Sequence, residues 1–260
     1  MASAQALRES PDLKFMFVCG GQGTRLLAVT GHSLKALAYL GDRPWVCEAI
    51  ALLKGSFRNA QAVVNIHADQ VAILKEEMGA LPCDPFETYV ETERGGVGHA
   101  ISQFSNSLGE AAQIVVVLGD IVFDENFPAW LAASIERAAA AGAEAFAVVQ
   151  KPRSKDTFDY DGLELGDDSR IAAVIPREAV NREALGASTL FQVGGVLWLN
   201  RNARKPIATL RRGTTFLGAI SEVWRSGIRI HAGCYDGLID DFGTAERYAQ
   251  LRQQQTSKQK

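Results

Sequence analysis

The chain has 260 residues, of which 47% are hydrophobic and 22% charged, proportions that exclude a disordered, collagenous or disulfide-stapled protein. Its formal net charge of −3, from 27 basic and 30 acidic residues, provides no global positive field to attract nucleic acid or anionic lipid. No apolar run approaches the roughly 20 residues needed to span a bilayer, so we expect neither a nucleic-acid nor a membrane partner.

Up to about residue 150, short β-branched runs alternate with longer amphipathic segments. The expected strands are Phe15–Cys19, Ala62–Ile66, Thr88–Glu91, Ile114–Leu118 and Ala145–Val149. The expected helices are Trp45–Lys54, Asp69–Met78, Gly98–Leu108 and Ala129–Ala141, with Asp69 capping the second and Pro128 near the start of the fourth. Strands that are apolar along their whole length and separated by helices indicate a mostly parallel sheet covered on both faces.

After Lys151 the pattern changes to short strands joined by turns. The elements expected there are strands at Leu163–Leu165, Ile171–Ile175, Gly195–Leu199 and Ile228–His231, and helices at Thr215–Arg225 and Thr244–Arg252. We therefore predict an α/β protein with an antiparallel elaboration in its second half. One domain is expected over residues 14–252, with a disordered leader at 1–13 and a solvated tail at 253–260.

The four cysteines predict a reducing environment. They form no CxxC pair, and the first 14 residues contain no apolar segment typical of a secretion signal. We therefore expect free thiols in a cytoplasmic protein.

A glycine-rich turn, Cys19-Gly20-Gly21-Gln22-Gly23-Thr24-Arg25-Leu26, follows the first strand. Its glycines allow backbone N–H groups to approach an anion, and Arg25 adds a planar cation, so the segment predicts binding of nucleotide phosphates. A P-loop is excluded because no Gly-Lys-Ser/Thr follows the glycines. A dinucleotide-binding turn lacks its third glycine, which is replaced by Leu26, but Asp42 lies about 20 residues on and keeps that alternative open. A turn with no ligand would leave Arg25 without a role.

Residues Gly20–Leu26 resemble the GGxGTRL signature of sugar-1-phosphate nucleotidyltransferases, with Cys19 where alanine is usual. Lys35, followed by Gly41 and Pro44, resembles the lysine segment of that family, with Leu34 in place of its proline. The resemblance extends over residues 14 to about 252 and implies a Rossmann-like (GT-A type) fold of three layers. It also divides the domain into a nucleotide-binding half, 14–150, and a sugar-phosphate-binding half, 151–252.

Two acidic segments resemble the metal-binding motifs of the same family. Leu118-Gly119-Asp120 matches its L-G-D motif, whose aspartate holds Mg²⁺. The segment 239–244 resembles its D-x-G-T motif and places the second metal carboxylate at Asp241, with Asp240 as the competing residue. Mg²⁺ usually takes one or two carboxylates together with phosphate oxygens, which suits a nucleoside triphosphate site.

The segment 91–101 resembles the base-binding loop of guanylyltransferases that act on mannose 1-phosphate or heptose 1-phosphate. Gly96 belongs to this loop, while Val97 and His99 replace a threonine and a glycine of the usual pattern. Glu91 can accept hydrogen bonds from N1–H and N2–H₂ of guanine. His99 is alternatively an exposed residue in the first turn of a helix.

The sugar half matches less closely. Gly162 lies in a segment that resembles the strand lining the sugar pocket, and Gly195 lies in one that resembles a later strand of that pocket. The usual Glu-Lys-Pro is replaced by 175–178, followed by a long insert at 179–192. Arg177 is the candidate for the role of the missing lysine, and Arg182 is an equal alternative.

The resemblance implies that a sugar 1-phosphate attacks the α-phosphorus of an NTP, GTP being favoured, to give an NDP-sugar and pyrophosphate. The resemblance implies that the β- and γ-phosphates of the NTP are bound by Gly20, Gly21, Gly23, Thr24 and Arg25, and that Lys35 neutralises the charge of the α-phosphate. It implies that the base is bound by Glu91 and Gly96, and Mg²⁺ by Asp120 and Asp241. The sugar phosphate would be bound by Gly162, Arg177 and Gly195.

Three alternative functions stay open. They are a cytidylyltransferase of a small phosphorylated alcohol, a non-catalytic nucleotide-binding regulator, and an NAD(P)-dependent oxidoreductase. The sequence is also compatible with assembly into a homo-oligomer.

Overall fold

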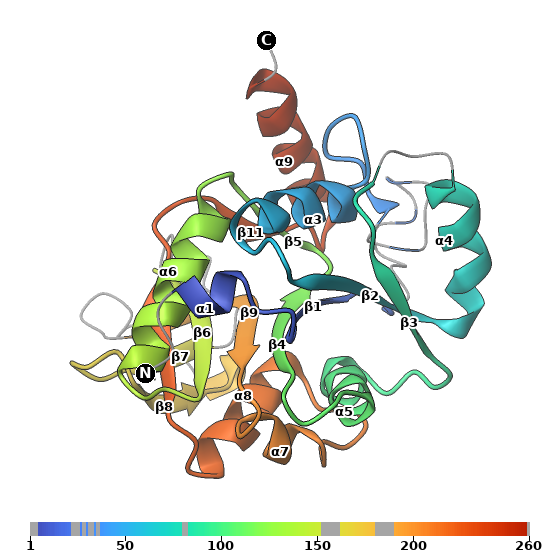
Figure 1. Cartoon of the computed structure of the whole chain (residues 1–260). Coiled ribbons are helices and arrows are strands. Elements are labelled where there is room, and N and C mark those ends of the chain that lie inside the picture. The colour runs from blue at the N-terminus through green and yellow to red at the C-terminus, as the bar shows by residue number, and fades with distance from the viewer. Residues whose placement is uncertain are drawn as a thin grey trace.

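The computed structural model describes residues 5–21, 27, 30, 34, 37–79, 83–151, 162–179 and 190–258. In this part of the chain a central sheet has the strand order β10-β6-β9-β4-β1-β2-β3 (Figure 1). These strands are β1 Leu13–Val18, β2 Gln61–His67, β3 Glu87–Glu91, β4 Gln113–Leu118, β6 Ala145–Gln150, β9 Leu190–Leu199 and β10 Ile230–Cys234. The pairs β1–β2, β1–β4, β2–β3 and β6–β10 are parallel, whereas β9 lies antiparallel between β4 and β6. The predicted α/β class, with a mostly parallel sheet, is confirmed.

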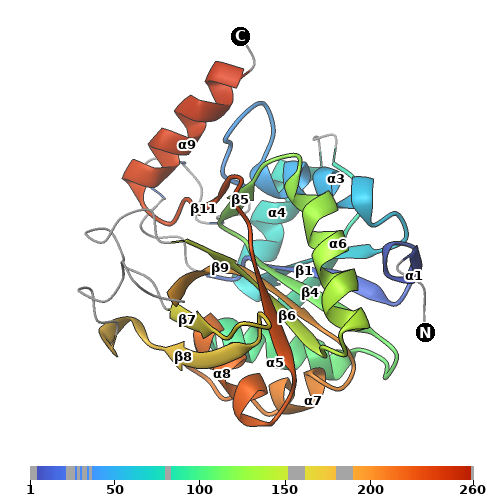
Figure 2. The same cartoon turned by 90° about the vertical axis from the view of Figure 1, so that its left-hand side faces the viewer.

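Helices cover both faces of this sheet, which gives three layers (Figures 1 and 2). Helices α3 (Trp45–Ser56) and α6 (Phe127–Ala140) lie on one face, and α5 (Val97–Ser107) and α8 (Phe216–Arg225) lie on the other. Successive side chains of a strand point to opposite faces. Phe15 and Phe17 of β1 therefore pack in the core beneath α3 and α6, while Met16 packs with residues of α5 and α8.

The antiparallel elaboration predicted for the second half of the protein is present, although β10 in that half pairs parallel with β6. Strands β7 (Gly162–Leu165) and β8 (Ile171–Ile175) form a hairpin, and β7 also pairs with β9. A separate small sheet joins β5 (Ile121–Phe123) to β11 (Ile239–Asp241), below α9 (Ala245–Lys258) in Figure 2. The sequence analysis missed this small sheet because each strand spans three residues, too few to show a period of two.

Other elements also differ from expectation. Strand β9 begins at Leu190, inside the segment interpreted as an insert. A 3₁₀ turn, η2 (Ala68–Gln70), precedes α4 (Val71–Met78), and its cap is the side chain of His67. Asp69 is thus not the predicted helix cap, because its carboxylate binds Arg94 instead.

Short elements also occur outside the predicted ones. They are α1 (Gln5–Arg8), η3 (Arg177–Ala179) and α7 (Arg204–Ile207). No helix in the described ranges combines the length and apolarity required of a transmembrane span.

Arg204 fastens α7 to the end of α5. It is 8% exposed and donates to the carbonyls of Ser105, Gly109 and Ala112 at 2.5, 3.0 and 2.8 Å. The carbonyl oxygens in the last turn of a helix lack the usual partner within the helix, so the guanidinium supplies a donor to Ser105 at the end of α5 and to two carbonyls in the connection that follows.

We expect Arg204→Met to lower the free energy of unfolding by about 3 kcal/mol, because it removes the hydrogen bonds that a buried guanidinium donates to several carbonyls. Urea denaturation measures this change. The matched control is Arg201→Met at an exposed neighbouring position, for which we expect a change within about 0.5 kcal/mol. Equal effects of the two substitutions would show that the buried hydrogen bonds contribute nothing specific.

Candidate active site

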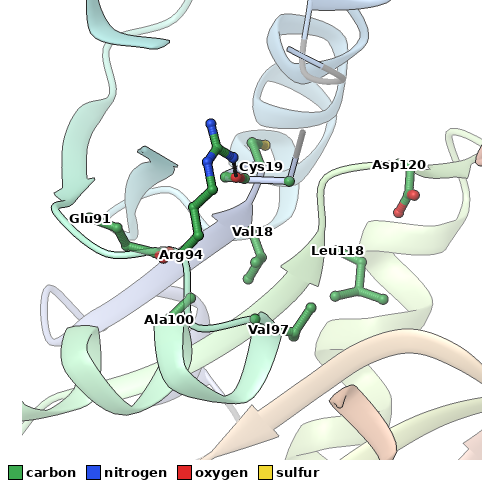
Figure 3. A pocket seen from close by; sticks show the side chains of 11 residues that line it. Val18, Cys19, Glu91, Arg94, Val97, Ala100, Leu118 and Asp120 are labelled. Carbon is green, nitrogen blue, oxygen red and sulfur yellow. Dashed lines mark hydrogen bonds between the residues drawn. The ribbon is translucent and has the colours of Figure 1, made fainter. Parts of the chain in front are cut away.

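A pocket of about 430 Å³ opens at the carboxyl ends of β1, β3 and β4 (Figure 3). In an open α/β sheet this edge is where ligands bind. Figure 3 shows Glu91 and Arg94 on one side of the pocket and Asp120 on the other, with Val97 and Ala100 of α5 below them. The lining residues are Val18, Cys19, Gly20, Gly21, Glu91, Arg94, Gly96, Val97, Ala100, Leu118 and Asp120.

The glycine turn begins where β1 ends, against the end of β4. Cys19 donates its N–H to the carbonyl of Asn65 at 2.9 Å, and Gly119 donates to the carbonyl of Val18 at 3.0 Å. A Cβ on Gly119 would lie 2.5 Å from Cys19 Sγ and 2.8 Å from Val18 O, so the close approach of the two strand ends requires glycine there. This contact places the L-G-D segment beside the glycine turn.

Several predicted residues lie outside the part of the chain that the structure describes. They are Gly23, Thr24, Arg25, Lys35, Arg182 and the side chain of Arg177. Their roles stay predictions.

The two candidate metal carboxylates are neighbours in space. Asp120 follows β4, Asp241 ends β11, and the N–H of Phe242 donates to the carbonyl of Asp120 at 3.0 Å. A Cβ on Gly243 would lie 3.0 Å from Asp241 Oδ1 and 3.6 Å from Asp120 Oδ2. The glycine of the D-x-G-T segment therefore leaves a small space that both carboxylates border, and Asp240 does not border it.

The donor chemistry of this pair fits a hard divalent cation, which prefers carboxylate oxygens. Asp241 Oδ1 accepts the N–H of Gly243 at 2.9 Å, and Arg247 donates to Oδ2. A carboxylate oxygen can accept more than one bond, so these contacts leave capacity for a metal. No group of three or more His, Cys, Asp or Glu side chains suited to a metal occurs in the described residues. Phosphate oxygens of a nucleotide or water would have to complete the coordination.

Glu91 ends β3 and is 4% exposed. A Cβ on Gly20 would lie 3.4 Å from Glu91 Oε1 and 3.5 Å from the side-chain oxygen of Asn65, so the turn, the carboxylate and the amide meet closely. Burial raises the pKa of Glu91, while Asn65 and then His99, His67 and Arg94 oppose the rise. A buried carboxylate beside an open pocket is suited to accept hydrogen bonds from a ligand.

Asn65 is a residue that the sequence analysis missed. It is fully buried in β2 beside the Glu91 carboxylate, and its side-chain nitrogen and oxygen make no hydrogen bond of ordinary geometry in the described part of the protein. A signal was available, because Asn65 interrupts the apolar sequence Val63-Val64-Asn65-Ile66. Buried polar groups normally have partners, so this amide is a candidate for contact with a ligand.

The predicted base-binding loop is packed against residues 213–214. Gly96 caps α5 with φ +85°, and Gly98 donates its N–H to the carbonyl of Thr214 at 2.8 Å. A Cβ on Gly98 would lie 2.6 Å from the Cβ of Thr214. His99 lies in the first turn of α5, as the alternative interpretation expected, but it is half-buried against Gly95 and not exposed, and its buried Nδ1 has no hydrogen-bond partner within the described ranges.

The two glycines predicted to bind the sugar phosphate lie on different strands. Gly195 has φ +72°, and a Cβ there would lie 2.6 Å from Ile121 Cγ1, which puts this part of β9 next to the segment after Asp120. Gly162 begins β7 and pairs with Gln192 of β9. Neither glycine lines the pocket described above. Their contact with a sugar phosphate stays a prediction.

Comparison with protein families shows to which family the chain belongs. Residues 14–172, more than half of the chain, match the sequence profile described as nucleotidyl transferase. The chain belongs to the nucleotidyl transferase family. The family recognised from the glycine turn and the aspartate motifs is thereby confirmed. A search of curated proteins gave no match.

Solved structures share the fold of this nucleotidyl transferase at low sequence identity. A UDP-glucose pyrophosphorylase complexed with UDP-glucose is 18% identical, with a TM-score of 0.73 over 94% of this chain and 98% of that one. A putative glucose-1-phosphate thymidylyltransferase from Bacillus anthracis is 18% identical, with a TM-score of 0.70 over 93% and 94%. HddC from Yersinia pseudotuberculosis, complexed with GMP-PN, is 15% identical, with a TM-score of 0.67 over 93% and 98%.

Proposed function

We propose that the protein transfers a nucleotidyl group from a nucleoside triphosphate, GTP being favoured, to a sugar 1-phosphate and releases pyrophosphate. The observation that carries this proposal is the meeting of the Gly20–Gly21 turn with Asp120 and Asp241 at one edge of the sheet. The nucleotidyl transferase family supports the reaction type. The structural neighbours whose printed names include UDP-glucose and glucose-1-phosphate support a sugar phosphate as acceptor.

In the proposed reaction an oxygen of the sugar phosphate forms a bond to the α-phosphorus of the NTP. The bond from that phosphorus to the bridging oxygen of the β-phosphate breaks, and pyrophosphate leaves with the electron pair. Such a transfer needs no covalent enzyme intermediate, because positioning and charge neutralisation are sufficient.

The residues of this chain divide that task. Backbone N–H groups of the glycine turn and Arg25 hold the β- and γ-phosphates, and Lys35 neutralises charge at the α-phosphate. Asp120 and Asp241 hold Mg²⁺, which supplies charge stabilisation at the phosphoryl oxygens when bound. Gly162, Gly195 and Arg177 or Arg182 bind the sugar phosphate.

GTP is favoured because Glu91 presents a carboxylate to the pocket. An ionised carboxylate only accepts hydrogen bonds, and guanine offers N1–H and N2–H₂ on one edge, whereas the matching edge of uracil or thymine alternates donor and acceptor. The HddC structure with GMP-PN shows that the same fold binds a guanine nucleotide elsewhere. A heptose-type 1-phosphate is the acceptor that we favour, and the cytoplasm, which supplies NTPs and keeps thiols reduced, is the proposed location.

The test combines thermal shift and pyrophosphate release. GTP, ATP, CTP and UTP are each added with Mg²⁺, first alone and then with a set of hexose and heptose 1-phosphates. A nucleotide at about 100 times its Kd should stabilise the fold by about 2.7 kcal/mol. We expect the largest shift with GTP, and pyrophosphate release only when a sugar 1-phosphate is present.

The other outcomes are informative. Turnover with CTP and a phosphorylated alcohol would establish the cytidylyltransferase alternative. Stabilisation by a nucleotide without turnover on any acceptor would favour a non-catalytic regulator. The absence of any response to nucleotides would refute the proposal.

A further inference from the structure

Arg94 belongs to the predicted base-binding loop, residues 91–101, and reaches the predicted phosphate-binding turn, yet no motif assigns it a role. Its Nη1 donates to the carbonyl of Gly20 at 2.9 Å (Figure 3). Its Nη2 lies 2.8 and 2.7 Å from the two carboxylate oxygens of Asp69. One guanidinium thus joins the turn after β1 to the turn after β2, and does so from the segment after β3.

A second side chain holds the next residue of the glycine turn. Gln70 donates from Nε2 to the carbonyl of Gly21 at 3.1 Å. The carbonyls of Gly20 and Gly21 are therefore each held by a long-range hydrogen bond. Because C=O and N–H of a trans peptide point in opposite directions, fixing the carbonyl of Gly20 also fixes the direction of the N–H of Gly21.

Asp69, the partner of Arg94, lies in η2 and is itself held by neighbouring side chains. His67 Nδ1 lies 2.8 Å from Asp69 Oδ1, and Gln70 Oε1 accepts the N–H of His67 at 3.0 Å. Arg94 and, less strongly, His67 hold the pKa of Asp69 below its usual range. The Asp69 carboxylate therefore keeps its charge toward Arg94 at any pH near neutrality. Asp69 itself does not line the pocket.

We propose that Arg94 is a positioning residue that couples the base-binding loop to the phosphate-binding turn. This proposal rests on the proposed function, in which Glu91, three residues earlier, accepts hydrogen bonds from the base. A base seated on Glu91 orders the segment that carries Arg94, and Arg94 in turn holds the Gly20–Gly21 peptide in the orientation that receives the triphosphate. Arg94 acts through the turn and Asp69 rather than by binding the nucleotide.

The test is a double-mutant cycle of Arg94→Ala, Asp69→Asn and the double variant, with kcat and KM measured for GTP and affinity measured for GTP and GMP. Each single change removes a charge-assisted hydrogen-bond partner, so we expect a loss of kcat/KM of about tenfold. The double variant should be no worse than Arg94→Ala, because both changes break one linked unit. GTP affinity should fall more than GMP affinity, since the turn serves the β- and γ-phosphates.

Two further variants sharpen the cycle. Arg94→Lys should restore less than half of the loss on a logarithmic scale, because a single ammonium group cannot span Gly20 and both oxygens of Asp69. The matched control is the exposed ion pair Arg170–Asp168 in the β7–β8 hairpin, for which Arg170→Ala should leave kcat and KM unchanged. A large loss in Arg94→Ala with normal kinetics in Asp69→Asn would overturn the proposal, because Arg94 would then contact the nucleotide directly.

A ligand-free measurement separates this inference from the proposed function. Amide hydrogen exchange of the peptide that contains Gly20 and Gly21 should be faster in Arg94→Ala and in Asp69→Asn than in the unaltered protein. Unchanged protection would overturn the coupling whatever the activity. Absence of turnover in the unaltered protein, combined with faster exchange in both variants, would refute the proposed reaction and retain the linkage.

Discussion

Replacing Asp120 with asparagine is expected to lower kcat for pyrophosphate release by on the order of 1000-fold, because a metal site contributes several kcal/mol to the transition state. The amide keeps the shape of the side chain but loses its charge. The backbone carbonyl of Asp120, which accepts from Phe242 at 3.0 Å, is unaffected, so the fold should persist. Steady-state kinetics at several Mg²⁺ concentrations and a thermal melt measure the two properties separately.

The same substitution at Asp241 should give a loss of similar size, and combining the two should add little, because both carboxylates serve one cation. Asp168→Asn, at an exposed position in the hairpin turn, is the control and should retain full activity. Normal turnover in Asp120→Asn, or an Mg²⁺ dependence identical to that of the unaltered protein, would remove Asp120 from the metal site.

Replacing Glu91 with glutamine is expected to lower kcat/KM with GTP by on the order of 100-fold, because two hydrogen bonds to a charged acceptor are weakened or lost. The preference for GTP over the other nucleotides should shrink with it. Glu87→Gln, at an exposed position at the start of the same strand, is the matched control. A variant with altered kcat/KM for all four nucleotides alike would show that Glu91 supports the pocket without selecting the base.

The same change should alter stability in a pH-dependent way. Burial raises the pKa of Glu91 in the folded protein above its usual value of 4.5. Below pH 4.5 the carboxyl is protonated in both the folded and the unfolded protein, so burying it carries no cost of burying a charge. As the pH rises through the window up to the raised pKa, the unfolded chain ionises first, and the folded state loses stability relative to it.

Glu91→Gln removes this penalty, so the variant should melt at a higher temperature than the unaltered protein at pH 8. The advantage should vanish at pH 4, where the unaltered carboxyl is protonated as well. Thermal melts across this range measure the difference. An advantage of equal size at both pH values would show that ionisation of Glu91 is not its source.

The class of fold and the family could be predicted from the residues alone, because the signals that carry them are local. Strand periodicity, the glycines that follow β1 and the motif Leu118-Gly119-Asp120 are each written in consecutive residues. The close contact with Cys19 requires glycine at position 119, so in this case a tertiary contact is also visible as a residue of the local motif.

Which distant residues come together depends on long-range packing and could not be predicted. Asp241 rather than Asp240 borders the same small space as Asp120 because β11 pairs with β5, and those strands are too short to be predicted. Arg94 and Asn65 matched no motif, since what distinguishes them depends on segments remote in sequence: Arg94 donates to Gly20, and the Asn65 side chain lies beside the same turn. The antiparallel place of β9 between two strands of the parallel set likewise depends on long-range pairing, which a sequence period cannot report. Local residue patterns therefore predict most helices and strands and the glycine turn. The site itself forms only when segments remote in sequence pack against each other.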